Sequence, residues 1–285
     1  MFLRMVFGSG RIDRTIAGTK MMSIGINIHC YSKELPIHKQ IKLMKENGFT
    51  ATFCMADIYD LDNIISKVQK EGIVFETLHA PLAGINKMWN EDKSGDEMLE
   101  KLLAVVQKCS QYQIPVLVVH LSAGRPAPHI NDIGNARYDK LMDYARRYGV
   151  KIAYENSRAI GNLGTALERY EDAYFCWDVG HENCFTKGMH FMPYFADRVA
   201  AIHLHDNMCK LDEDMHLLPF DGLINMQRVA SELVKSSYRG SIMLEVKRRD
   251  EKYKYKDLSP SQFYQRAADA ARRFEEMVNE ELRNY

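Results

Sequence analysis

The stretch YFCWDVGH, residues 174–181, passes from an apolar segment directly into an acidic residue and a histidine. The same design recurs in VLVVHLS (116–122) and KIAYENS (151–157), where apolar segments end in His120 and Glu155. Ionisable groups that end buried strands are costly unless they share partners. In a (β/α)₈ barrel the carboxyl-terminal ends of all strands open into one mouth, so these patterns predict a common cavity.

Eight apolar, β-branched segments alternate with stretches of helical periodicity along the chain. The predicted strands are residues 23–29, 50–54, 73–79, 116–120, 151–155, 174–178, 199–205 and 241–246. The predicted helices are residues 37–47, 61–71, 97–111, 138–148, 164–170, 226–236 and 261–282, with a short one near 191–195. Glycines at 48, 72, 149 and 240 are predicted to end helices.

Eight such units predict an α/β fold with a single (β/α)₈ barrel, which typically takes about 250 residues. An open, doubly wound nucleotide-binding sheet would need a glycine-rich loop after its first strand, and residues 29–33 read HCYSK. The chain has 285 residues, so we expect an N-terminal extension at 1–20 and one barrel domain at 21–285. No apolar run is long enough to predict a membrane span.

Composition narrows the classes of partner. The formal net charge is zero, which disfavours a dedicated nucleic-acid binder, although it leaves room for a local basic patch. The six cysteines are scattered without a CxxC pair, so we expect reduced thiols in a cytoplasmic protein. The amphipathic C-terminal segment can pack on the barrel or form the face of a homo-oligomer.

Carboxylates end three of the apolar strands, at Glu155, Asp178 and Glu245. Together with His203 they form a set of three oxygen ligands and one nitrogen ligand. That set suits Mn²⁺, Mg²⁺, Co²⁺ or Zn²⁺. The alternative is a salt-bridged or proton-sharing cluster without a metal ion.

Four stretches carry a resemblance to a known family: WDVGHEN (177–183), IHLHDN (202–207), DMHLLPFDGLIN (214–225) and LEV (244–246). The chain resembles the xylose-isomerase-like barrels of the sugar phosphate isomerase/epimerase group, a superfamily shared with endonuclease IV. The likeness covers residues 23–280. The family's Pro-Gly-x-Gly turn reads Pro219-Phe220-Asp221-Gly222 here, so its first glycine is missing.

The resemblance implies two ligand sets. An epimerase-like site with one metal ion would use Glu155, Asp178, His203 and Glu245. An endonuclease IV-like site with three metal ions would add His79, His120, His181, Asp214 and His216. Every one of these nine positions holds a suitable ligand in this chain, so ligand identity alone does not separate the two.

Three functional hypotheses follow. The first is a metal-dependent sugar or sugar phosphate isomerase or epimerase, with Glu155 and Glu245 as the catalytic acid and base. The second is an endonuclease IV-like hydrolase of phosphodiesters that uses zinc. The third is a barrel that binds a sugar-like ligand without catalysis, and a complete ligand set disfavours it.

Several residues at predicted strand ends or loops are candidates for binding the substrate. His181 and His205 would contact sugar oxygens, and His205 could instead orient a metal ligand. Trp89 would form an apolar wall or pack on the surface, and Arg125, like Arg158, would meet an anionic group or solvent. Lys247 begins a basic run, 247–256, that would bind a sugar phosphate or a nucleic-acid backbone, or remain a solvated loop.

Overall fold

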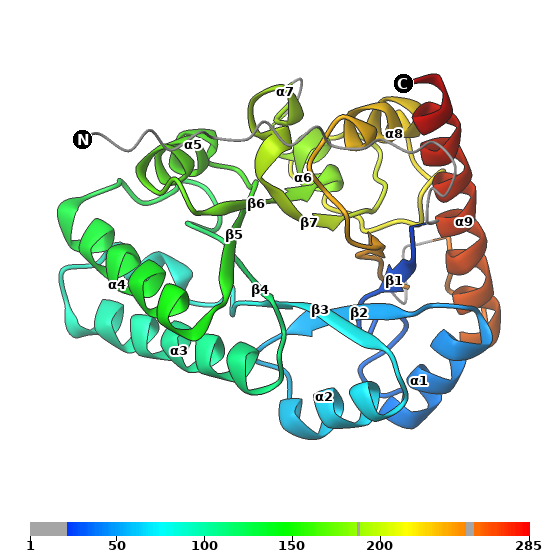
Figure 1. Cartoon of the computed structure of the whole chain (residues 1–285), viewed down its shortest axis with the longest axis horizontal. Helices are drawn as coiled ribbons and strands as arrows, with labels where there is room; N and C mark the ends of the chain where they lie inside the picture. Colours follow the sequence, from blue (N-terminus) through cyan, green and yellow to red (C-terminus); the bar gives the residue numbers. More distant parts are fainter. Residues whose placement is uncertain (1–21, 187–188, 249–253) are drawn as a thin grey trace, which may run out of the picture.

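The computed structural model describes residues 22–186, 189–248 and 254–285, and it shows a ring of strands surrounded by helices (Figure 1). All paired strands are parallel. The strands are β1 (Ile24–Ile26), β2 (Ala51–Met55), β3 (Val74–His79), β4 (Val116–Val119), β5 (Lys151–Glu155), β6 (Tyr174–Asp178), β7 (Val199–His203) and β8 (Ile242–Leu244). The expected (β/α)₈ barrel is therefore confirmed.

Helices connect successive strands on the outside of the ring. They are α1 (Ile37–Glu46), α2 (Leu61–Lys70), α3 (Lys93–Gln111), α4 (Asp132–Tyr148), α5 (Ile160–Arg169), α6 (Val179–Cys184), α7 (Met192–Phe195), α8 (Met226–Val234) and α9 (Pro260–Asn284), with the 3₁₀ turns η1 (Ile85–Trp89) and η2 (Ala196–Arg198). The last helix, α9, runs along the flank of the barrel beside α8 and α1 (Figure 1).

The strands follow the order β7-β6-β5-β4-β3-β2-β1-β8, so each lies next to its neighbour in sequence. The ring is closed between β7 and β8 by a parallel bridge from Leu204 to Leu244. Two backbone hydrogen bonds join the same strands, from Leu204 N to Met243 O at 2.9 Å and from Glu245 N to Leu204 O at 3.1 Å. Closure fixes the strand ends around one mouth.

Alternating side chains of the strands fill two separate layers. Inside the barrel a small cluster packs together from β4, β5, β6 and β7: Val116, Val118, Ala153, Cys176 and Ala201. The much larger apolar layer lies between the strands and the surrounding helices. The interior is thus a packed core, and the buried histidines and carboxylates described below lie at its mouth.

Most predicted element boundaries agree with the structure within a few residues, including three of the four glycine caps. Gly48, Gly72 and Gly149 have φ of 80°, 77° and 68° directly after their helices. The prediction for Gly240 was wrong, because α8 already ends at Val234 and Gly240 packs against the Tyr238 ring. The extension at 1–20 lies outside the described residues, and the 21–285 boundary stays a prediction.

The missing glycine of the turn at 219–222 has a structural consequence. Phe220 occupies that position with φ 73°, a left-handed conformation that is unusual for a bulky residue. The guanidinium of Arg273 lies 3.8 Å from the centre of the Phe220 ring. The turn therefore keeps the backbone shape that glycine would allow, at the expense of local strain.

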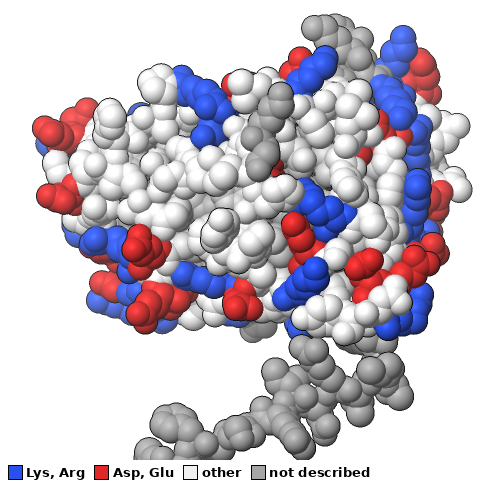
Figure 2. Space-filling view, turned by 90° about the horizontal axis from the view of Figure 1, so that it is seen from above, with Lys and Arg blue, Asp and Glu red and all other residues white. Residues whose placement is uncertain are grey.

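The charges on the face in Figure 2 are mixed, with basic and acidic side chains interspersed around its edge. None of the helices in the described ranges is both long and apolar enough to cross a membrane.

Helix α4 approaches η1 so closely that one of its positions must be glycine. A Cβ on Gly134 would lie 2.1 Å from Cε3 of Trp89, an indole that is buried and cannot retreat. We predict that Gly134→Ala destabilises the protein by about 1–3 kcal/mol through overpacking. Denaturant unfolding measures this change.

The matched control is Gly164→Ala in α5, where a Cβ would meet no atom within 4 Å. That substitution should stabilise the protein by up to about 1 kcal/mol because alanine favours the helix more than glycine does. Equal effects of the two substitutions would contradict the role assigned to Gly134.

Candidate metal centre

The barrel delivers one histidine or carboxylate from almost every strand to its carboxyl-terminal mouth. Four strands end in such a residue and two more, β4 and β8, end just before one, while α6 and the loop after β7 supply the remaining ones. Residues that the sequence spreads over more than 160 positions thereby lie together: His79, His120, Glu155, Asp178, His181, His203, His205, Asp214, His216 and Glu245.

The central group consists of Glu155, Asp178, His203 and Glu245, whose ligand atoms all lie within 4.8 Å of one another. His203 Nδ1 lies 3.0 Å from Glu245 Oε2 and 3.2 Å from Glu155 Oε2. The imidazole stacks on the Phe53 ring at 4.5 Å between centroids. This apolar contact holds the ring with Nδ1 directed at the two glutamates.

His203 also provides a test of whether this set fits a metal ion. The side chain is 1% exposed, and neither ring nitrogen makes a hydrogen bond, although two carboxylates lie close to Nδ1. A buried nitrogen without a partner is costly. A cation held by Nδ1 and the two carboxylates would give these three groups a partner, so the donor set fits a divalent metal ion.

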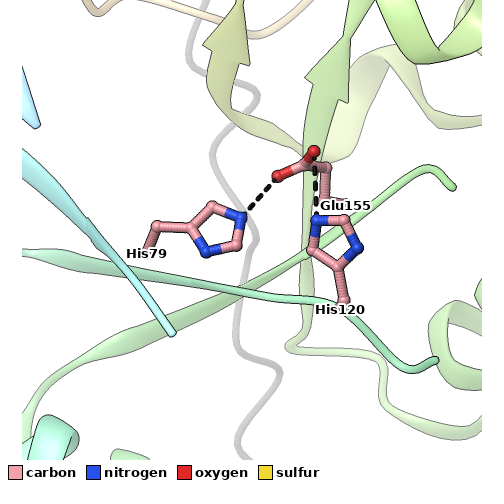
Figure 3. Close-up of side chains that lie close together, drawn as sticks. All are labelled: His79, His120 and Glu155. Atoms are coloured by element: carbon pink, nitrogen blue, oxygen red, sulfur yellow. Dashed lines mark hydrogen bonds and ion pairs between the residues drawn. The ribbon is translucent and has the colours of Figure 1, made fainter. Parts of the chain in front are cut away.

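A second group lies beside the first and shares Glu155 with it. His79 and His120 point at this carboxylate from two neighbouring strands (Figure 3). His79 Nε2 lies 3.1 Å from Oε2, and His120 Nε2 lies 3.2 Å from Oε1. Two nitrogen atoms and one carboxylate form a ligand set of the kind that zinc favours.

A third group is formed by His205, Asp214 and His216, with His181 nearby. Asp214 Oδ2 lies 2.8 Å from His216 Nε2 and 3.7 Å from His181 Nε2. Asp214 is in the loop after β7, and His216 has φ 48°. This group therefore depends on a loop conformation as well as on the strands.

Backbone carbonyls fix the proton on several of these rings. Because a carbonyl oxygen only accepts, the Nδ1 atom that faces it must carry a hydrogen. Such bonds run from His79 to Ala80 O at 2.7 Å and from His216 to Glu245 O at 2.9 Å. In a neutral ring Nε2 is then a bare lone pair that faces a carboxylate, which is the orientation of a metal-binding histidine.

The electrostatics of the group follow from burial and pairing. Burial alone would raise the pKa of Glu155, but the charges of His120 and His203 outweigh it and hold that pKa well below its usual range. The pKa of His203 is raised well above its ordinary value because nearby anionic groups outweigh its burial. The carboxylates are thus ionised, and the mouth requires compensating positive charge.

Helix α6 positions Asp178 and His181 relative to each other. Asp178 caps the helix, because its Oδ1 accepts the His181 N–H at 2.6 Å. Asn156 completes this junction by donating to Asp178 O and accepting from Asp178 N, both at 2.8 Å. Gly180 leaves room for His205, whose Cε1 would lie 1.8 Å from a Cβ at that position.

Comparison with known proteins places this arrangement in a family. The family described as xylose isomerase-like TIM barrel matches residues 41–274. The chain belongs to that family.

One relative is similar to the chain over part of its sequence. An uncharacterized protein of Sinorhizobium fredii, y4fM, is 36% identical over 104 residues, which is 36% of this chain and 31% of that relative. The matched segment thus spans about a third of the relative's length.

Two solved structures cover far more of the chain at low identity. D-psicose 3-epimerase from Clostridium cellulolyticum H10, solved with D-tagatose, has a TM-score of 0.73 and 11% identity, covering 90% of this chain and 99% of its own. The IolI protein, solved with a bound zinc atom, has a TM-score of 0.70 and 16% identity, covering 91% and 99%. At these identities the likeness is one of fold.

The five candidate substrate contacts in this xylose isomerase-like barrel lie in different places. His181 is in the mouth, and His205 is fully buried with Nε2 3.1 Å from Asp178 Oδ1. Lys247 Nζ lies 3.1 Å from His216 Nε2. Arg125 is on the rim, where it pairs with Asp212.

Trp89 is placed away from these groups. Its indole is 5% exposed, donates to Leu121 O at 2.7 Å and packs on Tyr138 and Gly134. The structure thus gives Trp89 a packing role under the loop after β3.

Sequence reasoning missed two residues that contact the candidate site, Phe53 and Asp212. An apolar residue within a strand and an acidic residue in a loop carry no distinguishing sequence pattern.

We predict that Mn²⁺ or Zn²⁺ raises the thermal unfolding midpoint of protein previously stripped with a chelator. An ion that binds only the folded state stabilises it by about 4 kcal/mol at a thousandfold excess over its dissociation constant. His203→Ala and Glu245→Gln should each remove most of the shift, as measured by differential scanning calorimetry.

The control is His129→Ala, a histidine exposed in the loop after β4, which should leave the metal-induced shift unchanged. A full shift in both cluster variants would show that the ion binds elsewhere.

Proposed function

We propose that this protein is a divalent-metal-dependent isomerase or epimerase that acts on a sugar or sugar phosphate. It would move a proton on a carbon next to a carbonyl group. The observation that carries the proposal is the pair of glutamates that converge on His203, Glu155 at 3.2 Å and Glu245 at 3.0 Å. The sugar epimerase among the structural neighbours supports this substrate class through the shared fold.

Two carboxylates on different sides of one position are what proton transfer between two faces of a sugar requires. Glu155 ends β5 and Glu245 follows β8, so they reach the centre from strands that are not neighbours. A divalent ion in the central group would act as a Lewis acid and make the C–H bond next to the carbonyl more acidic. The glutamates then provide the base and the acid.

The proton balance assigns complementary states to the two glutamates. One, ionised, accepts the proton from carbon and leaves the electron pair in an enediolate of the sugar. The other, which must gain a proton before this step, returns it to the opposite face of the same carbon, or to the adjacent carbon while the hydroxyl proton moves between the two oxygens. These two outcomes are epimerisation and isomerisation.

The two glutamates differ in accessibility. The side chain of Glu245 is 13% exposed, whereas that of Glu155 is 1% exposed and meets four histidines. Glu245 is therefore the better placed of the two to reach a sugar, and Glu155 combines proton transfer with holding the metal group. His181, which lies 2.9 Å from Glu155 in the mouth, would contact a sugar hydroxyl.

A second function, hydrolysis of a phosphoester with several zinc ions, is favoured by one specific observation. The groups His79–His120–Glu155 and His205–Asp214–His216 flank the centre, and each offers three ligand atoms within 4.8 Å. Several ions held side by side would activate water and stabilise a leaving oxygen. The number of ions bound distinguishes this chemistry from proton transfer.

We predict that Glu155→Gln and Glu245→Gln each abolish exchange of a substrate C–H proton with deuterated solvent, because an amide cannot accept that proton. The rate should fall by at least about a hundredfold, the usual contribution of a positioned acid or base. Proton NMR on ketose and aldose substrates in D₂O measures the exchange.

Metal analysis of the same samples separates the two candidate functions. About one ion per chain together with exchange supports the isomerase or epimerase. Two or three zinc ions per chain, hydrolysis of a phosphodiester and no exchange would replace it with the hydrolase. The control is Glu76→Gln, which should retain exchange. The Glu76 carboxylate accepts a hydrogen bond from Ser241 and lies away from the donor groups.

A further inference from the structure

A separate group of charged side chains lies on the rim of the mouth. Arg125 follows β4, Arg158 follows β5, and both pair with Asp212 in the loop after β7. Arg158 Nε donates to Asp212 Oδ1 at 2.8 Å, and Arg125 Nε lies 3.3 Å from Asp212 Oδ2. We call the two arginines the rim pair.

The rim pair is connected to the metal centre through one aromatic ring. The guanidinium carbon of Arg158 lies 3.5 Å from the centre of the Phe185 ring. Phe185 in turn stacks on His181 at 4.5 Å between centroids, and its carbonyl accepts from Arg125 Nη2 at 2.9 Å. A sugar that reacts beside His181 would therefore extend its far end toward the rim pair.

The charges of this group do not balance. The two guanidinium ions pair with one carboxylate, that of Asp212, so the three side chains together carry one net positive charge. Among the described residues, Arg158 Nη1 and Nη2 have no hydrogen-bond acceptor, so the outer edge of its guanidinium is available. Paired guanidinium groups bind phosphate oxygens through several charge-assisted hydrogen bonds at once.

The existing ion pairs are easy to open. The side chains of Arg158, Arg125 and Asp212 are 27%, 47% and 41% exposed, and exposed ion pairs contribute little to stability. Asp212 is held in place by its backbone, because its N–H donates to Cys184 O at 2.9 Å and its φ is 60°. Its carboxylate thus occupies the rim pair while the substrate is absent.

We propose that the rim pair is the binding subsite for a phosphate group carried by the substrate, and that Asp212 is an internal competitor which this phosphate displaces. The proposal rests on the proposed function for the position of the sugar. Binding of the anion itself requires no turnover, so it can be tested independently of the reaction.

The test titrates inorganic phosphate into the full-length, metal-free protein and follows binding by isothermal calorimetry. Arg158→Gln and Arg125→Gln should each weaken binding about tenfold, because each loses charge-assisted hydrogen bonds. Asp212→Asn keeps a residue that tolerates positive φ and removes the competing charge, so it should tighten binding several-fold.

The matched control is Arg146→Gln. Arg146 lies in the last turn of α4, at the end of the barrel away from the mouth, and pairs with Asp172 at 2.5 Å, with a side chain 46% exposed. The Arg146→Gln variant loses one positive charge, as the rim-pair variants do, and should bind phosphate with the affinity of the unchanged protein. Circular dichroism checks that each variant is folded.

Two results would overturn the proposal. Unchanged phosphate binding in both rim-pair variants would mean that the anion binds elsewhere, and weaker binding in Asp212→Asn would mean that Asp212 is not a competitor. Acetate is titrated in parallel, and acetate binding as tight as that of phosphate would replace the phosphate subsite with a carboxylate subsite. The exchange assay in D₂O has no bearing on these outcomes.

Discussion

The whole mouth of the barrel depends on one buried carboxylate, that of Glu155. Its Oε1 lies 3.2 Å from His120 and 2.9 Å from His181, and its Oε2 lies 3.1 Å from His79 and 3.2 Å from His203. An ionised group at this depth is stable only if positive charge surrounds it. The four segments that carry these rings, β3, the end of β4, α6 and β7, are therefore held in positions that stabilise this carboxylate.

Parallel strands alone deliver only part of the site, and the loop after β7 supplies the rest under strain. Four residues of this loop that are not glycine have positive φ: Cys209, Asp212, His216 and Phe220. Asp206 compensates by accepting backbone hydrogen bonds from Asn207, Gly222 and Ile224 at 2.8–3.0 Å. Strained backbone of this kind persists where the surrounding contacts over-determine it, typically at functional sites.

Local patterns in the sequence were sufficient to predict the barrel and the residues gathered at its mouth. Alternation of strands and helices and a histidine or carboxylate at most strand ends are short-range signals, and the barrel brings these residues close together. By contrast, the hydrogen bond from Trp89 to Leu121 and the stacking of Phe53 on His203 join residues from different strand–helix units of the barrel. The ion pair between Arg158 and Asp212 spans 54 positions of the sequence. No periodicity encodes such packing, and Gly240 shows that a turn residue alone does not locate a helix end.

The geometry links the number of bound ions to the kind of chemistry. Glu155 belongs to both the central group and the group with His79 and His120, so cations bound in both groups would make this carboxylate a much weaker base for a proton on carbon. Occupation of the central group alone leaves one oxygen of Glu155 available beside Glu245, as transfer between two glutamates requires. Occupation of the group with His79 and His120 would withdraw Glu155 from that role and favour activation of water. On the proposed function, the affinity of these flanking histidines for a further ion would decide between the two reactions.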